Sequence, residues 1–434
     1  MSANAASSRG ALLALYGGSP VRTSLLPYGR HCIREEDLEA VSRVLRSGWL
    51  TQGPALEEFE EAFAEAVGAR FAIGFSSGTA ALHGAVVAAE IEDGDEAITT
   101  PLTFCASANC ILYARGTPLF ADIREDTLTI DPDRIAEKIG PRTRAIIPVD
   151  YAGLPADLDR IRAIAERHAL VVIEDASHAL GARFDGKRVG SLSTLTTFSL
   201  HPVKHVAAGE GGVVTTEDPL LAARLRRFRS HGVDRDLRAR SAEGRWSYDM
   251  VELGYNYRLS DIAAALAHSQ LGRLQEGLER RAEIADRYDR ELAELPGLRV
   301  PPRREGSASA WHLYPLRVDE AVLGAPRDRV TAALRAEGIG ASLHYRPVHL
   351  HRFYRQRFGY RPGSFPISER ESDKLVTIPL YPAMSDGDVD DVVDAVSKVV
   401  RFFGLERSRA GPARPRSRRG RGSSSEDVRR RSSP

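Results

Sequence analysis

Lys204 is the residue of this sequence best suited to covalent chemistry. It lies in the polar run His201-Pro-Val-Lys-His205, which the glycine-rich run Gly209–Gly212 follows. A lysine amine condenses with carbonyl compounds to an imine when burial or neighbouring cations favour its neutral form, and histidines flank this lysine. A lone lysine is more often a solvated surface charge, so a chemical role for Lys204 requires partners elsewhere in the chain.

The run Ser76-Ser-Gly-Thr-Ala80 predicts an anion site. It joins a predicted strand to a predicted helix. The hydroxyls of Ser77 and Thr79 and free backbone N–H groups would therefore meet at a helix N-terminus, where the helix dipole favours negative charge such as a phosphate. The alternative is that one of these hydroxyls only caps the helix.

Asp175 follows the apolar run Leu170–Glu174. A buried carboxylate needs a cationic partner, and a structural salt bridge is one possibility. A protonated pyridine nitrogen is another, because an acidic residue beside it keeps the ring an electron sink. Together with Lys204 and the Ser-Gly-Thr loop, Asp175 predicts a site for pyridoxal phosphate, with Lys204 bound to this cofactor as an imine.

Short apolar runs between residues 70 and 216 predict the buried strands that must position these side chains. Helical patterns lie between some of them, at 79–89 and 157–168. This alternation predicts an α/β fold with a mostly parallel sheet flanked by helices, and such sheets bind ligands at the carboxyl ends of their strands. The predicted strands are 71–75, 96–100, 119–122, 145–149, 170–174, 196–200 and 213–216.

The second half of the chain predicts a smaller α+β domain. A helical pattern runs from Ser260 through Arg290, and prolines at 296, 301 and 302 precede a strand-like run at 312–318. Further helices are predicted at 327–337 and 386–403, with an extended segment at 341–345. We expect an N-terminal extension at 1–16, a large cofactor-binding domain at 17–259, a connecting helix at 260–295, a small C-terminal domain at 296–404 and a disordered tail at 405–434.

The composition indicates a globular protein with a distinct tail. The chain of 434 residues is 42% hydrophobic and 27% charged, and its net charge of +1 hides a basic C-terminus rich in Arg and Ser. That tail gives only weak support for nucleic-acid binding. The 3 cysteines suit neither a disulfide framework nor a zinc site, which favours the reducing cytoplasm, and no apolar run is long enough to predict a membrane span.

Two other runs imitate functional motifs. Gly181–Lys187 has the glycine and lysine spacing of a nucleotide phosphate loop, but Arg188 stands where that loop requires Ser or Thr. We therefore interpret Asp185-Gly186 as a hairpin turn. His344, His349 and His351 could suggest a metal, but no acidic or cysteine partner is near them in the sequence, and we expect no metal site.

In combination the motifs resemble the DegT/DnrJ/EryC1/StrS sugar-nucleotide aminotransferases, which are fold type I enzymes that use pyridoxal phosphate. The resemblance runs from about Gly17 to Leu405 and rests on four motifs in family order. The four motifs are Ser77-Gly-Thr79, Asp175-Ala-Ser-His178, Ser199-x-His-x-x-Lys204 and Gly209-Glu-Gly-Gly212.

The resemblance implies a role for each site residue. Ser77, Gly78 and Thr79 with Ser199 would hold the cofactor phosphate, and Phe104 would stack on the pyridine ring. Asp175 would bind the ring nitrogen with support from His178. Asn256 would reach the cofactor phosphate of a neighbouring subunit, which implies a homodimer with shared active sites.

Three further runs resemble the enzymes that make UDP-4-amino-4,6-dideoxy-N-acetyl-β-L-altrosamine, an intermediate of pseudaminic acid synthesis. They are Val149–Gly153, Phe228–Gly232 and Leu343–Pro347. The implied reaction moves an amino group from L-glutamate to C4 of a UDP-linked 4-keto-6-deoxy-2-acetamido sugar. Lys204 would hold the cofactor and then, as a free amine, carry the proton between the amino-acid Cα and cofactor C4′.

The diphosphate of such a substrate would need polar or cationic contacts. Arg229, His231, Arg258 and His344 are our hypothesised contacts, with simple solvation as the alternative for each. Two other functions stay open. One is a C3 aminotransferase, or another C4 aminotransferase, acting on a dTDP- or GDP-linked keto-deoxysugar. The other is a non-catalytic regulator that binds pyridoxal phosphate, with the tail as its nucleic-acid or partner contact. Lys204 argues against the related sugar dehydratases, which carry histidine there.

Overall fold

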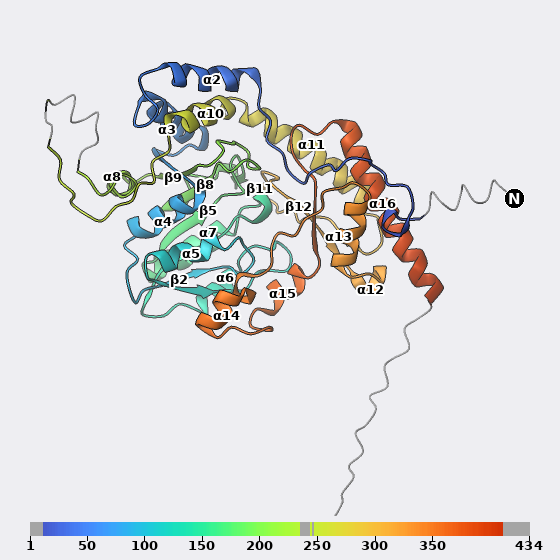
Figure 1. Ribbon diagram of the computed structural model, residues 1–434. Coiled ribbons are helices and arrows are strands. Elements are labelled where there is room, and N and C mark those ends of the chain that lie inside the picture. Colours follow the sequence, from blue (N-terminus) through green and yellow to red (C-terminus); the bar gives the residue numbers. More distant parts are fainter. Residues whose placement is uncertain (1–11, 235–243, 245–246, 411–434) are drawn as a thin grey trace, which may run out of the picture.

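A computed structural model describes residues 12–234, 244 and 247–410 of the chain. Its centre is a seven-stranded sheet of order β1-β9-β8-β5-β4-β2-β3, with helices around it (Figure 1). All strands of this sheet run in one direction except β9, which pairs antiparallel with both β1 and β8. The strands are β1 (Phe71–Phe75), β2 (Glu96–Thr99), β3 (Thr117–Phe120), β4 (Thr143–Ile147), β5 (Val171–Asp175), β8 (Leu195–Ser199) and β9 (Gly212–Thr216).

The sheet confirms the predicted fold class and the predicted strands, whose ends differ by at most two residues. Apolar side chains such as Ile73, Ile98 and Ile147 are fully buried, as expected for a sheet covered on both faces. The turn at Asp185-Gly186 is also confirmed. It joins β6 (Arg183–Phe184) to β7 (Lys187–Arg188), which pair antiparallel, and both turn residues have positive φ.

Helix α4 (Gly78–Ala88) shows how the site is anchored. Its sequence is apolar almost all round, and most of its residues are buried against the sheet, α5 and α8. Small side chains allow this close approach, since a Cβ on Gly84 would lie 2.8 Å from the Phe75 ring. The other helices of the large domain are α2 (Glu35–Arg46), α3 (Pro54–Val67), α5 (Ala106–Tyr113), α6 (Pro132–Ala136), α7 (Leu158–His168) and α8 (Pro219–Phe228).

The predicted connecting helix is two helices, α10 (Asp261–Leu271) and α11 (Leu274–Leu292), with Gly272 and Arg273 between them. The small domain packs a three-stranded antiparallel sheet against α13 and α16 (Figure 1). Its elements are β10 (Leu298–Arg299), β12 (Tyr314–Val318), β13 (Leu375–Ile378), α12 (Glu320–Leu323), α13 (Arg327–Ala336), α14 (Arg352–Phe358), α15 (Pro366–Ser372) and α16 (Asp386–Ala410).

Within the segment 341–345, which we predicted to be extended, Ser342 makes an isolated antiparallel bridge to Thr377. One expectation for this half differs from the structure. Helix α16 continues to Ala410, past residue 405 where we predicted the disordered tail to begin. Residues 411–434 and 1–11 lie outside the described residues. Where the chain is described, no helix is long and apolar enough to cross a membrane.

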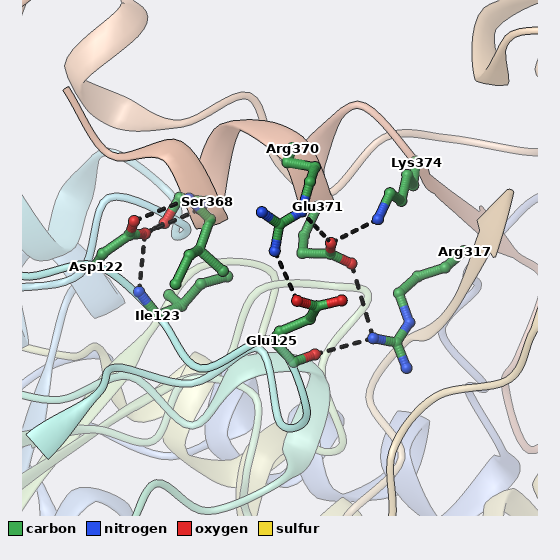
Figure 2. Close-up of polar contacts among 9 residues, drawn as sticks. Asp122, Ile123, Glu125, Arg317, Ser368, Arg370, Glu371 and Lys374 are labelled. Atoms are coloured by element: carbon green, nitrogen blue, oxygen red, sulfur yellow. Dashed lines mark hydrogen bonds and ion pairs between the residues drawn. The ribbon is translucent and has the colours of Figure 1, made fainter. Parts of the chain in front are cut away.

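Helix α15 fastens the small domain to the loop after β3 (Figure 2). The buried Asp122 carboxylate accepts hydrogen bonds from the backbone N–H groups of Ile367 and Ser368, both at 2.9 Å, and from the Ser368 hydroxyl. At the other end of α15 the Ser372 hydroxyl donates to the Tyr345 carbonyl at 2.8 Å. The sheet edge therefore holds the segment that carries His344 and Tyr345.

Glu371 adds an ionic contact beside this anchor (Figure 2). Its carboxylate is 1% exposed and lies 2.7 Å from Lys374 Nζ, 3.3 Å from Arg370 Nε and 3.7 Å from Arg317 Nη1. Arg370 also pairs with Glu125 of the large domain at 2.6 Å, and Arg317 donates to the Glu125 carbonyl at 2.9 Å. A shared network of this kind holds the two domains in one orientation.

Candidate active site

A cavity of about 530 Å³ opens at the carboxyl edge of the sheet. Nine of the thirteen predicted site residues line it. They are Ser77, Gly78, Thr79, Phe104, Asp175, His178, Ser199, Lys204 and His344. The strand ends bring most of them together, because β1, β2, β5 and β8 are parallel and end at the same edge.

Gly212 explains why the phosphate loop and Ser199 meet. It pairs in register with Phe75 of β1 on one side and with Ser199 of β8 on the other. A Cβ on Gly212 would lie 2.4 Å from the Ser77 carbonyl oxygen, and a Cβ on Gly78 would lie 2.9 Å from Ser199 Cβ. Only glycine allows this approach, so the glycine-rich run closes the loop onto β8.

The start of α4 serves both functions considered for it. The Ser77 hydroxyl accepts a hydrogen bond from the Ala80 N–H at 3.1 Å and caps the helix. The N–H groups of Gly78 and Thr79, in the first turn, have no intrahelical acceptor and lie at the cavity wall. This arrangement fits a phosphate group.

The Asp175 carboxylate lies at the cavity wall without an ion-pair partner among the described residues. It is 4% exposed, and its two oxygens accept hydrogen bonds from the Ser107 hydroxyl at 2.7 Å and from the Ser177 N–H at 3.1 Å. No lysine, arginine or histidine of the described residues forms an ion pair with it. The structural salt bridge is therefore absent from the described part of the chain, and the carboxylate suits a protonated ring nitrogen.

The support expected from His178 to Asp175 comes from Ser107 instead. The His178 Nδ1 atom accepts from the Ala152 N–H at 3.3 Å, so the neutral ring carries its proton on Nε2, 3.1 Å from the Tyr345 hydroxyl. His178 thus orients Tyr345. Ser107 was missed because it lies 68 residues before Asp175 and no sequence signal connects the two.

Lys204 has the electrostatic surroundings that its proposed chemistry requires. Burial lowers the pKa of its amine to about 7, and the charge of Arg281 lowers it further while Asp175 opposes the change. Its Nζ atom lies 3.4 Å from Nε2 of His312. Close to neutral pH the amine is available in its neutral form, which both imine formation and proton transfer need.

Neutral histidines surround this amine. The rings of His178 and His312 lie 4.4 Å apart, and burial holds the pKa of each well below its usual range. His205 donates to the Ala310 carbonyl at 2.8 Å, and burial lowers its pKa to about 3. His312 was not predicted from the sequence, because it lies 108 residues after Lys204 and only the fold brings them together.

Phe104 and His344 occupy different parts of the wall. The Phe104 side chain is 56% exposed and lies 6.1 Å from the Tyr345 ring, between ring centroids. His344 contacts the Thr377 hydroxyl through Nδ1 at 3.0 Å, and burial lowers its pKa to about 4. His344 is therefore neutral at neutral pH and offers a substrate diphosphate no positive charge.

Four predicted residues do not line the cavity. The Arg229 guanidinium is buried, forms an ion pair with Glu60 and donates to the Gly74 carbonyl at 2.7 Å. These internal partners occupy the guanidinium within its own subunit, and its role as a substrate contact stays a prediction. Arg258 is half-buried beside Arg229, and burial with the neighbouring charge lowers its pKa. His231 and Asn256 are exposed, and their segments are joined by the isolated bridge between Ser230 and Asn256.

The His-rich run forms no metal cluster. His349 pairs with Glu369 at 2.9 Å, His344 with Thr377, and His351 is exposed. In the described ranges no group of three or more His, Cys, Asp or Glu side chains is placed to hold a metal ion. The site therefore combines a desolvated lysine, a carboxylate without an ion-pair partner among the described residues and a helix start whose free N–H groups suit an anion.

Comparison with models of known protein families gives a match over most of this chain. The model of the DegT/DnrJ/EryC1/StrS aminotransferase family matches residues 31–397. The chain belongs to this family. The predicted resemblance and the predicted transaminase class are thereby confirmed.

Individual similar proteins match this chain over almost their full length. The spore coat polysaccharide biosynthesis protein SpsC of Bacillus subtilis is 42% identical over 382 residues, which cover 88% of this chain and 98% of SpsC. PseC of Helicobacter pylori, an aminotransferase involved in the biosynthesis of pseudoaminic acid, is 32% identical with a TM-score of 0.80. That match covers 87% of this chain and 100% of the PseC chain.

The cofactor prediction is confirmed as well. The putative sugar aminotransferase Spr1654 of Streptococcus pneumoniae has been solved in forms with pyridoxal phosphate and with pyridoxamine phosphate. The latter form is 30% identical to this chain with a TM-score of 0.82, and the match covers 87% of this chain and 100% of that one. The family depends on pyridoxal phosphate, and the residues of this aminotransferase fit that group at the phosphate, the ring nitrogen and the aldehyde.

Proposed function

We propose that this aminotransferase moves the amino group of L-glutamate to C4 of a UDP-linked 4-keto-6-deoxy-2-acetamido sugar, a step suited to pseudaminic acid synthesis. The observation that carries the reaction type is the desolvated Lys204 amine in one cavity with the unpaired Asp175 carboxylate. The role of PseC in pseudoaminic acid biosynthesis and the role of SpsC in polysaccharide biosynthesis support a sugar substrate. The C4 position and the UDP group rest on the three sequence runs that resemble the altrosamine-forming enzymes.

Each side chain has a definite task in this proposal. Ser77, Gly78, Thr79 and Ser199 hold the phosphate, and Asp175 keeps the ring nitrogen protonated. Bound pyridoxal phosphate supplies an electron-poor ring that takes up the charge left when the amino-acid Cα loses its proton. Lys204 removes that proton as a neutral amine and returns it at C4′. Phe104, which lines the same cavity, would stack on the pyridine ring.

The shared active site is part of the same proposal. Asn256 is exposed and lies outside the cavity of its own subunit, which agrees with a contact to a partner subunit. A mixing experiment tests this. Lys204→Ala and Asn256→Ala homodimers should each be inactive, whereas their mixture should regain activity, because one site of the heterodimer then has both native residues. No recovery after subunit exchange contradicts a shared site.

The reaction itself is tested in two steps. Glutamate should convert the absorbance of the lysine-bound cofactor to that of the aminated cofactor, and a 4-ketosugar nucleotide should restore it. NMR of the product then shows whether the amine stands at C4. Absence of the glutamate-dependent change defeats the proposal, and an amine at C3 of a dTDP sugar establishes the alternative substrate. Location in the cytoplasm stays a prediction that cell fractionation checks.

A further inference from the structure

A second cavity lies on the other side of Lys204. It has a volume of about 370 Å³ and is lined by Arg30, Arg34, Lys204, Arg273, Arg280 and Arg281, together with other residues of α11 and of the segment before α2. Lys204 is the one residue that lines both this cavity and the cofactor cavity within the described chain. The segment 28–30 spans the two, because Tyr28 lines the first and Arg30 the second.

Most charges of this second cavity are already paired. Arg34 pairs with Glu276, Arg273 donates to Asp37 at 2.9 Å, and Arg280 pairs with Glu283 at 3.1 Å and Asp386 at 2.7 Å. The remaining acidic residue of the wall, Glu279, accepts a hydrogen bond from Gln275 at 2.9 Å. These pairs leave little negative charge free to neutralise a further cation.

Two arginines of the same wall have no carboxylate partner. Arg281 is 2% exposed and donates only to the carbonyls of Trp311 at 3.1 Å and Leu380 at 3.0 Å. Arg30 is exposed and makes no hydrogen bond or ion pair with any residue that the structure describes. The cavity therefore carries surplus positive charge next to the reacting lysine, which favours an anion.

The amino donor supplies an anion of the right size and place. In the proposed function, the Cα of glutamate must come to Lys204, and its side-chain carboxylate is only three bonds further on. The diphosphate of a sugar nucleotide is attached at C1, across the ring from the C4 that reacts, and so lies away from Lys204. A carboxylate adjacent to Lys204 thus fits the donor and not the nucleotide.

We propose that the second cavity binds the side-chain carboxylate of the amino donor, with Arg30 as its cationic anchor. The inference rests on the proposed function, because it assumes a dicarboxylic amino acid as donor. Arg30 then decides specificity: it distinguishes glutamate from donors of similar size without a second carboxylate. Arg281 contributes background positive charge but is held by its two carbonyl acceptors.

The test compares Arg30→Gln with Arg46→Gln, which removes an exposed arginine at the end of α2 that lines neither cavity. Loss of a charged hydrogen bond in Arg30→Gln should raise KM for glutamate about 10-fold to 100-fold with kcat changed less than about threefold. KM for the sugar nucleotide should stay within about twofold. Arg30→Lys should recover part of the loss, and Arg46→Gln should leave both KM values near those of the native enzyme.

A binding measurement makes the test independent of turnover. Glutarate, which has two carboxylates and no amine, is titrated into the holoenzyme by calorimetry, and Arg30→Gln should weaken it about as much as it raises KM for glutamate. Unchanged glutarate binding overturns the proposal, and so does a raised KM for the sugar nucleotide alone. The glutamate-dependent absorbance change of the native holoenzyme is measured first, so failure of the proposed function is recognised separately.

Discussion

The network around Glu371 and the cavity around Lys204 differ in how completely their charged side chains are paired. Glu371 is buried and faces three cations, two of which also contact Glu125 across the domain boundary. In the cavity, Asp175 has no ion pair among the described residues, and Lys204 lies beside neutral histidines. Complete pairing stabilises an orientation, whereas incomplete pairing leaves charge for a ligand to complete. Substitutions in the two regions should therefore damage different properties.

The largest effect is expected from Lys204→Ala. Removal of the amine takes away the cofactor bond and the proton carrier, so turnover should fall by about 1000-fold or more while the circular dichroism spectrum stays native. Lys187→Ala removes an exposed lysine of β7 and serves as the matched control. If borohydride still fixes the cofactor to the Lys204→Ala chain, another lysine carries it.

A smaller loss is expected from Asp175→Asn. The amide cannot hold a proton on the ring nitrogen, so turnover should fall about 100-fold to 1000-fold even though the side-chain volume is kept. Stopped-flow absorbance with glutamate measures the first half of the reaction. Equal rates in Asp175→Asn and native enzyme would show that the carboxylate is structural only.

The His312→Phe variant tests how the neutral histidines affect Lys204, and a pH titration measures the effect. The neutral His312 Nε2 accepts a hydrogen bond from the Lys204 ammonium, so its loss removes a stabilising contact of the charged form. The pKa of Lys204, about 7 in the native chain, should then fall. Amine labelling of Lys204 in the full-length cofactor-free chain, followed by peptide mass spectrometry across pH, measures this pKa.

The free amine reacts, so native labelling should increase as the pH rises through about 7, and the midpoint should move to lower pH in His312→Phe. His312→Gln, which retains a polar atom near the Nε2 position, should restore most of the native midpoint. His168→Phe, at an exposed position on α7, is the control. An unchanged midpoint in His312→Phe would limit His312 to packing.

The smallest effect on turnover is expected from Glu371→Ala, which instead lowers stability. The variant leaves Lys374, Arg370 and Arg317 without their shared carboxylate, and the free energy of unfolding should fall by about 2 kcal/mol. Urea denaturation measures this loss, and Glu320→Ala, on the exposed start of α12, should change it by less than about 0.5 kcal/mol. A large fall in kcat of folded Glu371→Ala would mean that domain orientation controls the chemistry.

The sequence predicts those site residues well that lie at the end of a predicted strand. Ser77, Asp175 and Ser199 each lie at or just beyond the carboxyl end of a parallel strand, and the glycine-rich run indicates close backbone approach. Such local patterns locate side chains because strand direction places them at one edge. The fold class and most element ends follow from the same hydrophobic patterns.

Contacts between distant segments could not be predicted in this way. His312 and Ser107 contact the site only after the chain has folded, and no spacing rule relates them to Lys204 or Asp175. The pairing of Arg229 with Glu60 was likewise not foreseen, because the two lie 169 residues apart. Whether an arginine is paired or free depends on tertiary structure, and a sequence pattern does not contain that information.

The burial of α4 limits the substitutions that this helix can accept. Many of its residues are small, because the helix packs against the sheet, α5 and α8, and its first turn lines the cavity where we propose that the cofactor phosphate binds. A larger side chain in the middle of α4 would displace the helix, and the N–H groups at its start would move with it. The interior of α4 can therefore accept few replacements without displacing the proposed phosphate site at its start.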